Sequence, residues 1–553
     1  MNKRFLSVVL SVGMAASCLL ASACQNGDNP QNDGDVAGKT TIRVATYNGG
    51  LGMQWLNEAA RRFETEYAGR SFEENKTGVA VKVSEADTGD MLANRNLDKE
   101  VYLTESVDYY YLQQKGKLAN ISDIVTADLG DFGETEKTIE GKLDGAMKDF
   151  LTAKDGNYYA LPFYDGIYGF VYDVDTFESY GWFLDENGNF TSTSKSKGID
   201  GVEGTYDDGL PKTYAQFKKL LDKIRLDTVT PLVYANESMT YFVPAMANYW
   251  ADYEGKEKML MNWYHTGTTD VVASFDASGN PVISTSTLTK DNLSDLQKQP
   301  GKYYALKFLK EVLMSNPKNY VSASDFKTAQ YQFIQSGLDS GENPVAMIID
   351  GAWFENETDL SGMFELASLS DGNYDGSVEY KKTRKFSFMP IPMADESQAT
   401  LDAGSKTESG AHKQTIISFN ESFCFISASA SGARLEVAKE FVKFLHTDAE
   451  LGAFTAKTSV TRPLTYSLSD TQKNELSYFA KTLVEMKESS DVVYPYSNSA
   501  EYVAHSAKYR IGTWGWVSKI GGTEAKNPFN HFIMDKNKND TAKNYFEGLY
   551  LAH

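Results

Sequence analysis

The feature that most constrains the fold is an alternation of strand and helix patterns, which begins early in the chain. Residues 41–47 have the composition of a buried strand, a glycine-rich turn follows, and an amphipathic helix then carries Trp55, Ala59 and Phe63 on one face. A second strand is predicted at 79–83. A β–turn–α–β order implies parallel strands joined by a right-handed crossover. We therefore expect an α/β fold.

The alternation continues through the second half of the chain. Thr213 and Gln216 have the spacing of a capping box, which marks the start of a helix. The further elements that the pattern predicts are strands at 101–103, 170–173 and 345–349, and helices at 106–114, 213–224, 303–314, 327–335 and 433–445. A chain of 553 residues exceeds what one hydrophobic core usually serves, so two α/β lobes are expected.

The first 24 residues have the pattern of an export signal. Lys3 and Arg4 precede an uncharged apolar stretch at 5–20, and small residues then lead to Cys24. A cysteine directly after small residues resembles the bacterial lipoprotein pattern, which implies lipidation of Cys24 after removal of 1–23. The protein would then be anchored outside the cytoplasm, on the outer face of the cell membrane. The alternative is an ordinary secreted protein cleaved near Ala23.

The segment that follows is predicted to be a flexible tether. Residues 24–39 are rich in Asn, Asp, Gly and Gln and contain almost nothing apolar, so they cannot offset the entropy of ordering. A random coil of this length spans on the order of 20 Å. No later segment has the roughly 18 uninterrupted apolar residues of a membrane span, so contact with the membrane is expected through the lipid alone.

The composition and motifs of the chain argue against several classes of function. A net charge of −21 argues against binding nucleic acid or anionic lipid. Gly49, Gly50 and Gly52 form no phosphate-binding motif, because neither the dinucleotide pattern nor a Walker lysine is present. Cys424 lies in an apolar run and is predicted to be a buried, inert thiol. Aromatic residues make up 13% of the chain, more than a core alone explains.

Several segments in chain order resemble a known family. They are the run Tyr158–Phe163 followed by a glycine-rich turn and the strand at 170–173, the run 344–353 with glycine two residues before Trp353, Pro390-Ile391-Pro392, and the helix opening at Ser431. Together they resemble the extracellular solute-binding proteins of bacterial ABC importers, in the carbohydrate-binding group. The resemblance covers most of 40–460. The segments 183–210 and 265–300 fit less well and are interpreted as insertions.

The resemblance implies a periplasmic-binding-protein-like fold of two α/β lobes with a hinge, and a ligand cleft at the carboxyl ends of the strands. Carried over, lobe one would hold 40–164 and 395–460, and lobe two 165–394 and 461–553, with an insertion at 183–210. It also implies a monomer without enzymatic activity that captures an oligosaccharide by lobe closure and delivers it to the transmembrane subunits of an ABC permease.

Candidate ligand-binding residues follow from the resemblance and from the chemistry of sugars, whose faces stack on aromatic rings and whose hydroxyls pair with carboxylates and amides. The candidates are Tyr47, Asp165, Tyr168, Trp353 and Trp514. For Tyr47 the alternative is packing of a turn, and for Trp353 a place in a lobe core. A core role is at least as good for Trp250 and Trp263, and a solvated surface carboxylate is the default for Glu105.

Two other functions stay open at this point. A surface glycan-binding lipoprotein without a permease would have the same leader and the same aromatic excess. A glycoside hydrolase needs only two apposed carboxylates, which 75 Asp and Glu residues do not exclude. No His-Glu-x-x-His or Gly-x-Ser-x-Gly motif supports catalysis.

The insertion at 183–210 suggests a structural calcium ion. Oxygen-bearing side chains stand at alternate positions from Asp185, as in the first half of an EF-hand loop, and hard Ca²⁺ favours such ligands. Asp200 or Glu203 could add charge. The predicted ligands are Asp185, Asn187, Asn189, Thr191, Asp207 and Asp208. The alternative is an Asn-Gly turn between two surface strands.

Overall fold

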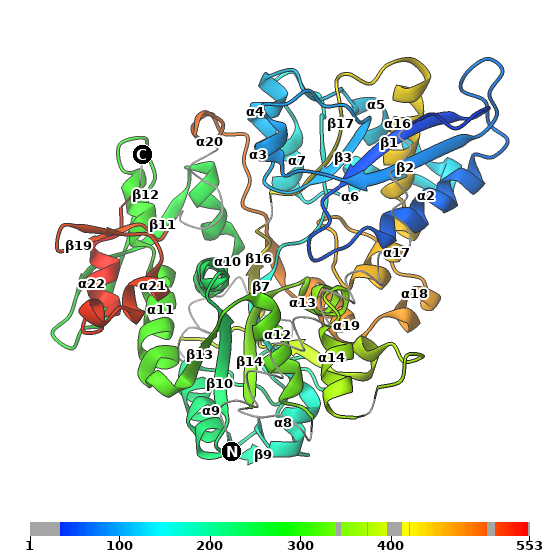
Figure 1. Cartoon of the computed structure of the whole chain (residues 1–553). Helices are drawn as coiled ribbons and strands as arrows, with labels where there is room; N and C mark the ends of the chain where they lie inside the picture. The colour runs from blue at the N-terminus through cyan, green and yellow to red at the C-terminus, as the bar shows by residue number, and fades with distance from the viewer. Residues whose placement is uncertain are drawn as a thin grey trace.

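The computed structural model describes residues 34–338, 344–372, 374–394, 412–419, 421–505 and 515–550. The described residues do not include the predicted signal segment 1–23, Cys24, most of the tether or Trp514. Figure 1 shows two α/β lobes, one above the other, joined by a narrow central region. Within the described ranges, no helix has both the length and the apolar character needed to span a bilayer.

The first lobe is built on a five-stranded sheet in the order β2-β1-β3-β17-β6. Its strands are β1 (Thr40–Thr46), β2 (Val79–Glu85), β3 (Val101–Thr104), β6 (Leu161–Pro162) and β17 (Phe423–Ile426). β1 pairs in parallel with β2 and β3, which confirms the crossover expected from the sequence. β17, which arrives from the other lobe, runs antiparallel to β3.

The second lobe has a five-stranded sheet in the order β13-β10-β14-β7-β15. Its strands are β7 (Tyr168–Asp173), β10 (Thr230–Ala235), β13 (Tyr320–Ala323), β14 (Val345–Gly351) and β15 (Phe386–Phe388). β10 is parallel to β13 and β14, whereas β7 is antiparallel to β14, with Tyr168 opposite Gly351. The chain enters β7 from the other lobe, so β7 begins at the edge where β14 ends.

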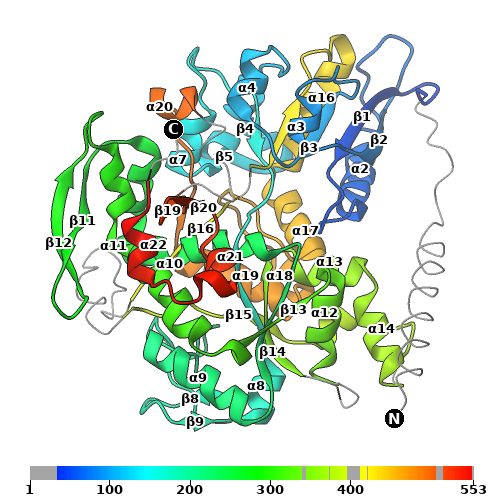
Figure 2. The ribbon, with the colours of Figure 1, turned by 60° about the vertical axis from the view of Figure 1, so that its left-hand side comes forward.

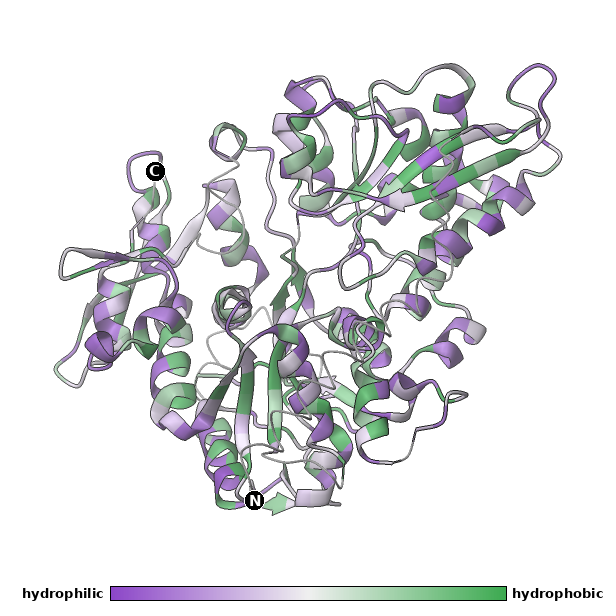
Figure 3. Ribbon diagram, in the orientation of Figure 1, coloured by the Kyte–Doolittle hydropathy of each residue, from purple (hydrophilic) through white to green (hydrophobic). Residues whose placement is uncertain are grey.

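Helices cover both sheets, with polar residues outward and apolar residues toward the strands (Figure 3). The first lobe has α2 (Gln54–Glu66), α3 (Gly89–Leu92), α4 (Tyr109–Gln114), α5 (Ser122–Val125), α6 (Ile139–Lys142), α7 (Gly145–Leu151), α16 (Gly432–Leu445) and α17 (Asp448–Thr458), with the hairpin β4 (Asp128–Leu129) and β5 (Glu134–Thr138). The second has α8 (Val174–Tyr180), α9 (Tyr214–Leu226), α10 (Phe242–Tyr264), α11 (Pro300–Lys307), α12 (Phe326–Gln335), α13 (Phe354–Leu360) and α14 (Met363–Ser370).

Further elements are two-stranded sheets and C-terminal helices. Three of these sheets are hairpins, namely β8 (Phe183–Leu184) with β9 (Phe190–Thr191), β11 (Thr268–Phe275) with β12 (Pro281–Thr287), and β19 (Ser518–Ile520) with β20 (Thr523–Ala525). β16 (Thr415–Ile417) and β18 (Asp491–Val493), which lie far apart in the chain, pair in parallel. The helices are α18 (Asp470–Glu475), α19 (Tyr478–Ser489), α20 (Ala500–Ala504), α21 (Pro528–Ile533) and α22 (Ala542–Glu547). In Figure 2, α21 and α22 lie beside α10 and α11 of the second lobe.

Three segments cross between the lobes side by side. They run through 163–167, 418–422 and 459–462, and backbone hydrogen bonds join them, from Asp165 N to Thr461 O (2.9 Å) and from Phe419 N to Gly166 O (2.8 Å). β16, just before the second crossing, packs on α10 of the second lobe. The described residues 412–417 therefore belong with the second lobe, so the first lobe resumes at the crossing rather than at residue 395.

The long helix α10 was not predicted, and its burial explains why. The backbone at Gly255 is not helical and divides α10 into two parts, and almost every residue of the first part is buried. α10 packs against the second sheet, α11 and β16. A helix surrounded by protein shows no apolar stripe with a period of 3.6 residues, which is the signal used to find helices. Trp250 and Trp263 both lie on α10 and are 1% and 0% exposed, which places them in the core.

Candidate functional site

The carboxyl ends of strands from both lobes meet at the lobe junction. Tyr47 and Glu105 directly follow β1 and β3 of the first lobe. Asp350 is the penultimate residue of β14 in the second lobe. We call the side chains gathered here the inter-lobe cluster, which consists of Tyr47, Glu105, Tyr164, Tyr168, Tyr241, Gln330, Asp350, Trp353 and Glu357. In an open α/β sheet, the carboxyl edge is where ligands bind.

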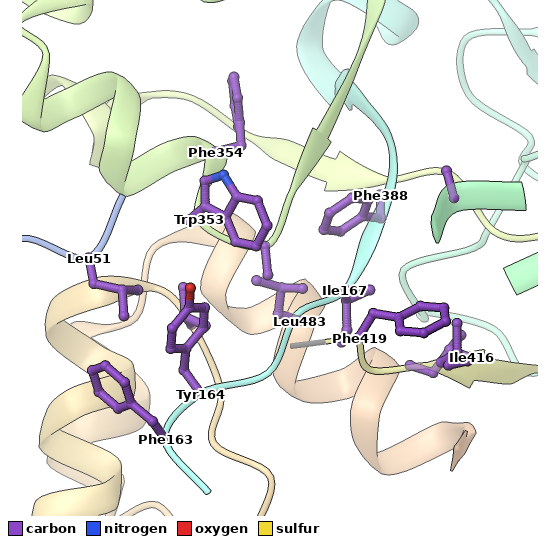
Figure 4. Packing of buried hydrophobic residues seen from close by; sticks show 14 of the residues in the cluster. Leu51, Phe163, Tyr164, Ile167, Trp353, Phe354, Phe388, Ile416, Phe419 and Leu483 are labelled. Carbon is purple, nitrogen blue, oxygen red and sulfur yellow. The ribbon is translucent and has the colours of Figure 1, made fainter. Parts of the chain in front are cut away.

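Trp353 stands at the centre of the inter-lobe cluster. Its ring meets the rings of three tyrosines edge to face, at centroid distances of 5.0 Å to Tyr168, 5.9 Å to Tyr241 and 6.5 Å to Tyr164. Figure 4 shows Trp353 and Tyr164 turned toward the same space beside Leu51, while Phe354 points away into the second lobe. Trp353 is 8% exposed, and it contacts Gly50 of the first lobe as well as Tyr168 and Tyr241 of the second, so it packs between the lobes.

Glycine allows this close approach of Trp353 to the backbone. A Cβ atom at residue 351 would lie 2.4 Å from the Trp353 ring, and one at residue 50 would lie 2.8 Å from the Trp353 Cβ atom. Neither position has room for a side chain. Gly351 thus explains the glycine two residues before the tryptophan in the sequence, and Gly50 explains part of the glycine-rich turn after β1.

Glu105 is the acidic group that the first lobe contributes to the inter-lobe cluster. The Tyr164 hydroxyl donates a hydrogen bond to it. Burial raises the pKa of Glu105 to about 7, against a lowering effect of Tyr47, and Glu357 raises it further. In turn the charge of Glu105, more than burial, raises the pKa of Tyr47 to about 12. Glu105 is therefore not the solvated surface carboxylate expected by default.

The second lobe contributes two carboxylates that share one donor. Gln330 Nε2 lies 3.2 Å from Asp350 Oδ2 and 2.8 Å from Glu357 Oε2. Burial, and then the charge of Glu357, raises the pKa of Asp350 to about 8. Burial also raises the pKa of Glu357. This arrangement offers acceptors for hydroxyl or amine hydrogens beside an aromatic surface.

The two lobes touch at one edge of the inter-lobe cluster. Asn356 Nδ2, on α13 of the second lobe, donates to the carbonyl oxygen of Gly50 in the first lobe at 2.8 Å. A Cβ atom at residue 52 would lie 3.0 Å from the Leu360 side chain, so the loop after β1 rests along α13. The lobes are therefore in contact in this structure.

Asp165 occupies a different place from the predicted one. It is wholly buried, and its carboxylate accepts hydrogen bonds from Ser418 Oγ (2.9 Å) and Thr461 Oγ1 (2.7 Å), with Lys487 Nζ at 3.0 Å. Ser418 and Thr461 lie on the other two crossing segments. Both carboxylate oxygens are thus used within the hinge, so the assignment of Asp165 to ligand binding is not supported, and its role is to hold the crossings together.

The structure brings three of the predicted ligand-binding residues together, namely Tyr47, Tyr168 and Trp353, while Trp514 lies outside the described residues. Sequence reasoning missed Tyr164, Tyr241, Gln330, Asp350 and Glu357. The position of Asp350 was detectable, because it directly precedes the glycine at the end of a strand that was predicted. Tyr241 was not, because the strand before it, β10, was not predicted.

The predicted calcium ligands at 185–191 form a hairpin turn between β8 and β9. Asp185 Oδ1 accepts from the backbone N–H groups of Asn187 (2.9 Å) and Asn189 (2.8 Å), and Asn189 Nδ2 donates to its other oxygen. The turn between β11 and β12 repeats this arrangement with Asp276 and Asn280. The recurrence indicates that this residue pattern serves the turn, as in the alternative interpretation of the sequence.

The other predicted calcium ligands lie in the loop at 199–208. The Asp207 carboxylate accepts from the backbone N–H groups of Ile199 (2.6 Å) and Asp200 (3.0 Å) and from Thr205 Oγ1 (2.8 Å). Asp208 accepts from Gly204 N. In the part of the chain that the structure describes, no three Asp, Glu, His or Cys side chains gather as a metal site. The residues as placed therefore do not fit the predicted calcium ion.

Comparison with known proteins identifies the family. The family model described as bacterial extracellular solute-binding protein matches residues 53–380. The chain belongs to this family. The match takes in strands of both sheets, although not β1, β15 and β17, and every residue of the inter-lobe cluster except Tyr47. No curated protein matches the sequence.

Similar solved structures are distant in sequence. The apo form of RafE from Streptococcus pneumoniae is 14% identical, with a TM-score of 0.50 over 93% of this chain and 98% of that one. The GacH receptor of Streptomyces glaucescens, solved unliganded and with acarbose, is 14% identical over 93% and 97% of the two chains, at a TM-score of 0.49. The Thermus thermophilus maltotriose-binding protein is 16% identical over 92% and 97%, at 0.47. The family is one of solute-binding proteins, and the RafE structure supports the fold.

Proposed function

We propose that this member of the family binds an oligosaccharide between its lobes and delivers it to the transmembrane subunits of an ABC permease. The observation that carries the proposal is the composition of the inter-lobe cluster. Trp353 and its tyrosines supply aromatic surface for sugar C–H faces, while carboxylates from both lobes accept hydroxyl hydrogens. The aromatic excess of the sequence gathers in part at this place.

Lobe closure provides the mechanism. Tyr47 and Glu105 belong to the first lobe, and Asp350 and Trp353 to the second, so only a closed arrangement presents all four to one ligand. The hinge is the set of three crossing segments that Asp165 joins. Hinge closure on a ligand is the motion typical of periplasmic binding proteins. A closed form stabilised by sugar is the state that a permease would recognise.

The anchor belongs to the same proposal. A lipid on Cys24 would hold the protein at the outer face of the membrane, and the residues up to 39 would act as its tether. Mass spectrometry of protein expressed in its native host should find a lipid on Cys24 that a Cys24→Ser variant lacks. A mature chain that starts near Ala23 without a lipid would contradict the anchor and leave the binding function intact.

The binding function is tested by a panel of oligosaccharides of differing linkage and length. Thermal shift identifies any sugar that stabilises the protein, because a ligand of the native state raises the melting temperature. Small-angle scattering with that sugar should show compaction, and calorimetry should show one site per chain. Compaction with a peptide but with no sugar would contradict the proposal.

A further inference from the structure

Three carboxylates of the inter-lobe cluster share one property. Some buried carboxylates elsewhere have a cationic partner, as Asp173 has Arg384 and Glu450 has Arg62, whereas Glu355 accepts from the hydroxyls of Ser459 and Ser477. Glu105, Asp350 and Glu357 have no ion-pair partner among the described residues. They receive hydrogen bonds from neutral groups instead, which include the hydroxyl of Tyr164, the amide of Gln330 and, for Asp350, the backbone N–H of Gly351 (2.7 Å).

The neutral donors are too few for the charge that they face. A single Gln330 Nε2 atom serves both Asp350 and Glu357. Gln330 is wholly buried, and its Oε1 atom has no hydrogen-bond partner within the described ranges. An amide held between two carboxylates, with its own acceptor unused, leaves a buried site that lacks hydrogen-bond donors.

The surroundings add negative rather than positive charge. Glu85, at the end of β2, and Glu237, after β10, both act on residues of the inter-lobe cluster. The cation that acts on Glu357 is Lys327, which is exposed on α12. The exposed lysine is screened by water, whereas the three carboxylates are partly or wholly removed from it. Burial raises the pKa of Glu105 to about 7 and of Asp350 to about 8, as expected where charge lacks compensation.

Aromatic rings complete the environment. Tyr168 and Tyr241 meet Trp353 edge to face, and their own rings lie 5.2 Å apart. Aromatic faces attract ammonium groups as well as sugar C–H groups, and carboxylates at hydrogen-bond distance strengthen that preference. An anionic sugar would meet carboxyl groups from both lobes, and an ammonium group that binds among them favours their ionised forms.

We propose that Glu105, Asp350 and Glu357 make the site selective for amine-bearing oligosaccharides, such as those with a free hexosamine, over neutral sugars, and exclude uronic acids. The inference rests on the proposed function, because it names the class of oligosaccharide that the same site takes. The amine supplies the hydrogen-bond donors and the positive charge that these three carboxylates lack among the described residues. Neutral sugars supply hydroxyl donors without charge, and uronates add charge of the wrong sign.

The experiment compares charge classes on one sugar backbone by isothermal titration calorimetry. For each backbone that binds in the oligosaccharide panel, the 2-amino, neutral, 2-acetamido and 6-carboxyl forms are titrated into the full protein at pH 7. We expect the amine form to bind at least tenfold more tightly than the neutral and acetamido forms. The carboxyl form should bind at least tenfold more weakly than the neutral form.

Variants identify the residues responsible. Glu357→Gln and Glu105→Gln keep the shape of the side chain and should reduce the amine preference at least threefold, whereas Glu178→Gln on exposed α8 should leave it unchanged. Equal affinity for amine and neutral forms of the wild type, or binding of the carboxyl form, would overturn the inference while the proposed function stands. If no oligosaccharide of any class binds, the proposed function fails and the inference with it. The wild-type comparison decides the matter even if a variant does not fold.

Discussion

Asn356 donates a hydrogen bond across the lobe junction to the backbone carbonyl of Gly50, with Nδ2 and the oxygen 2.8 Å apart. The donor lies on α13 of the second lobe and the acceptor in the loop after β1 of the first. α13 begins at the residue after Trp353, and Gly50, like Gly351, lies against the Trp353 side chain. Lobe contact and the candidate ligand site therefore share the same few residues.

We expect Asn356→Ala to favour the open arrangement of the lobes. The variant loses one hydrogen bond that only the closed arrangement makes, which is worth about 1 kcal/mol, or roughly a fivefold loss of ligand affinity. Calorimetry with the best sugar of the panel measures it. Asn57→Ala is the matched control, because Asn57 Nδ2 donates to Met53 O within one lobe. An equal loss of affinity in the control would show that the hydrogen bond to Gly50 does not specifically stabilise the closed arrangement.

Asp165→Ala should destabilise the fold by about 3 kcal/mol or more, because removing one member of a buried ion pair leaves the other uncompensated. Ser418 and Thr461 lose their acceptor in the same step. Chemical denaturation measures the free energy of unfolding. Asp175→Asn, which breaks an exposed pair with Lys385, should cost less than about 1 kcal/mol. If Asp165→Ala keeps full stability but loses sugar binding, Asp165 is instead a ligand-binding residue.

Trp353→Ala should weaken sugar binding by about 2 kcal/mol, as for a buried aromatic anchor. The variant should also melt at a lower temperature, since Trp353 is 8% exposed and packs against three tyrosines. Trp182→Phe, at a buried tryptophan remote from the inter-lobe cluster, should lower the melting temperature without changing the dissociation constant. If Trp353→Ala melts early but keeps full affinity once folded, Trp353 is a core residue.

The sequence predicted the parts of the site that depend on position along a strand. Tyr47 and Trp353 follow strands whose patterns are clear, and Tyr168 begins one. The sequence did not reveal the hinge contacts of Asp165, because its partners lie far away in the chain, at Ser418, Thr461 and Lys487. A buried carboxylate of the hinge and a carboxylate of a ligand site look the same in one sequence.

The helix α10 and the antiparallel direction of β7 and β17 were not predicted, for a related reason. The neighbours of α10 bury almost every residue of its first part, so no amphipathic period marks it there. β7 and β17 run antiparallel because the chain enters each of them from the opposite lobe, and the entry points depend on the crossings. These properties are set by tertiary structure, whereas local patterns report local structure.

The pH dependence of stability follows from Asp350. Burial and the charge of Glu357 raise its pKa to about 8 in the folded state, from the ordinary aspartate value of 3.8. The folded state then binds more protons than the unfolded state between these values, so this contribution is full below the unfolded pKa and is lost as pH rises through about 8. Asp350→Asn removes it. The melting temperature of the variant relative to wild type should therefore rise from pH 6 to pH 9.

The difference between variant and wild type isolates Asp350 from other buried groups, such as His446 and Lys302, whose pKa values burial lowers. Differential scanning calorimetry across this pH range measures it, with Glu178→Gln as a control whose difference stays constant. A constant difference for Asp350→Asn as well would mean that Asp350 is ionised in the folded protein at neutral pH.

The last prediction concerns calcium and the two matching hairpin turns. Asp185 and Asp276 each accept two backbone N–H groups and an Asn side chain, so their oxygens are committed to the turn. Calorimetry of EDTA-treated protein should therefore show the same melting temperature with and without added Ca²⁺, and Asp185→Ala and Asp276→Ala should lower it by similar amounts. A calcium-dependent rise that Asp185→Ala abolishes and Asp276→Ala keeps would establish the ion expected from the sequence, because the two turns differ in their surroundings and not in their hydrogen bonds.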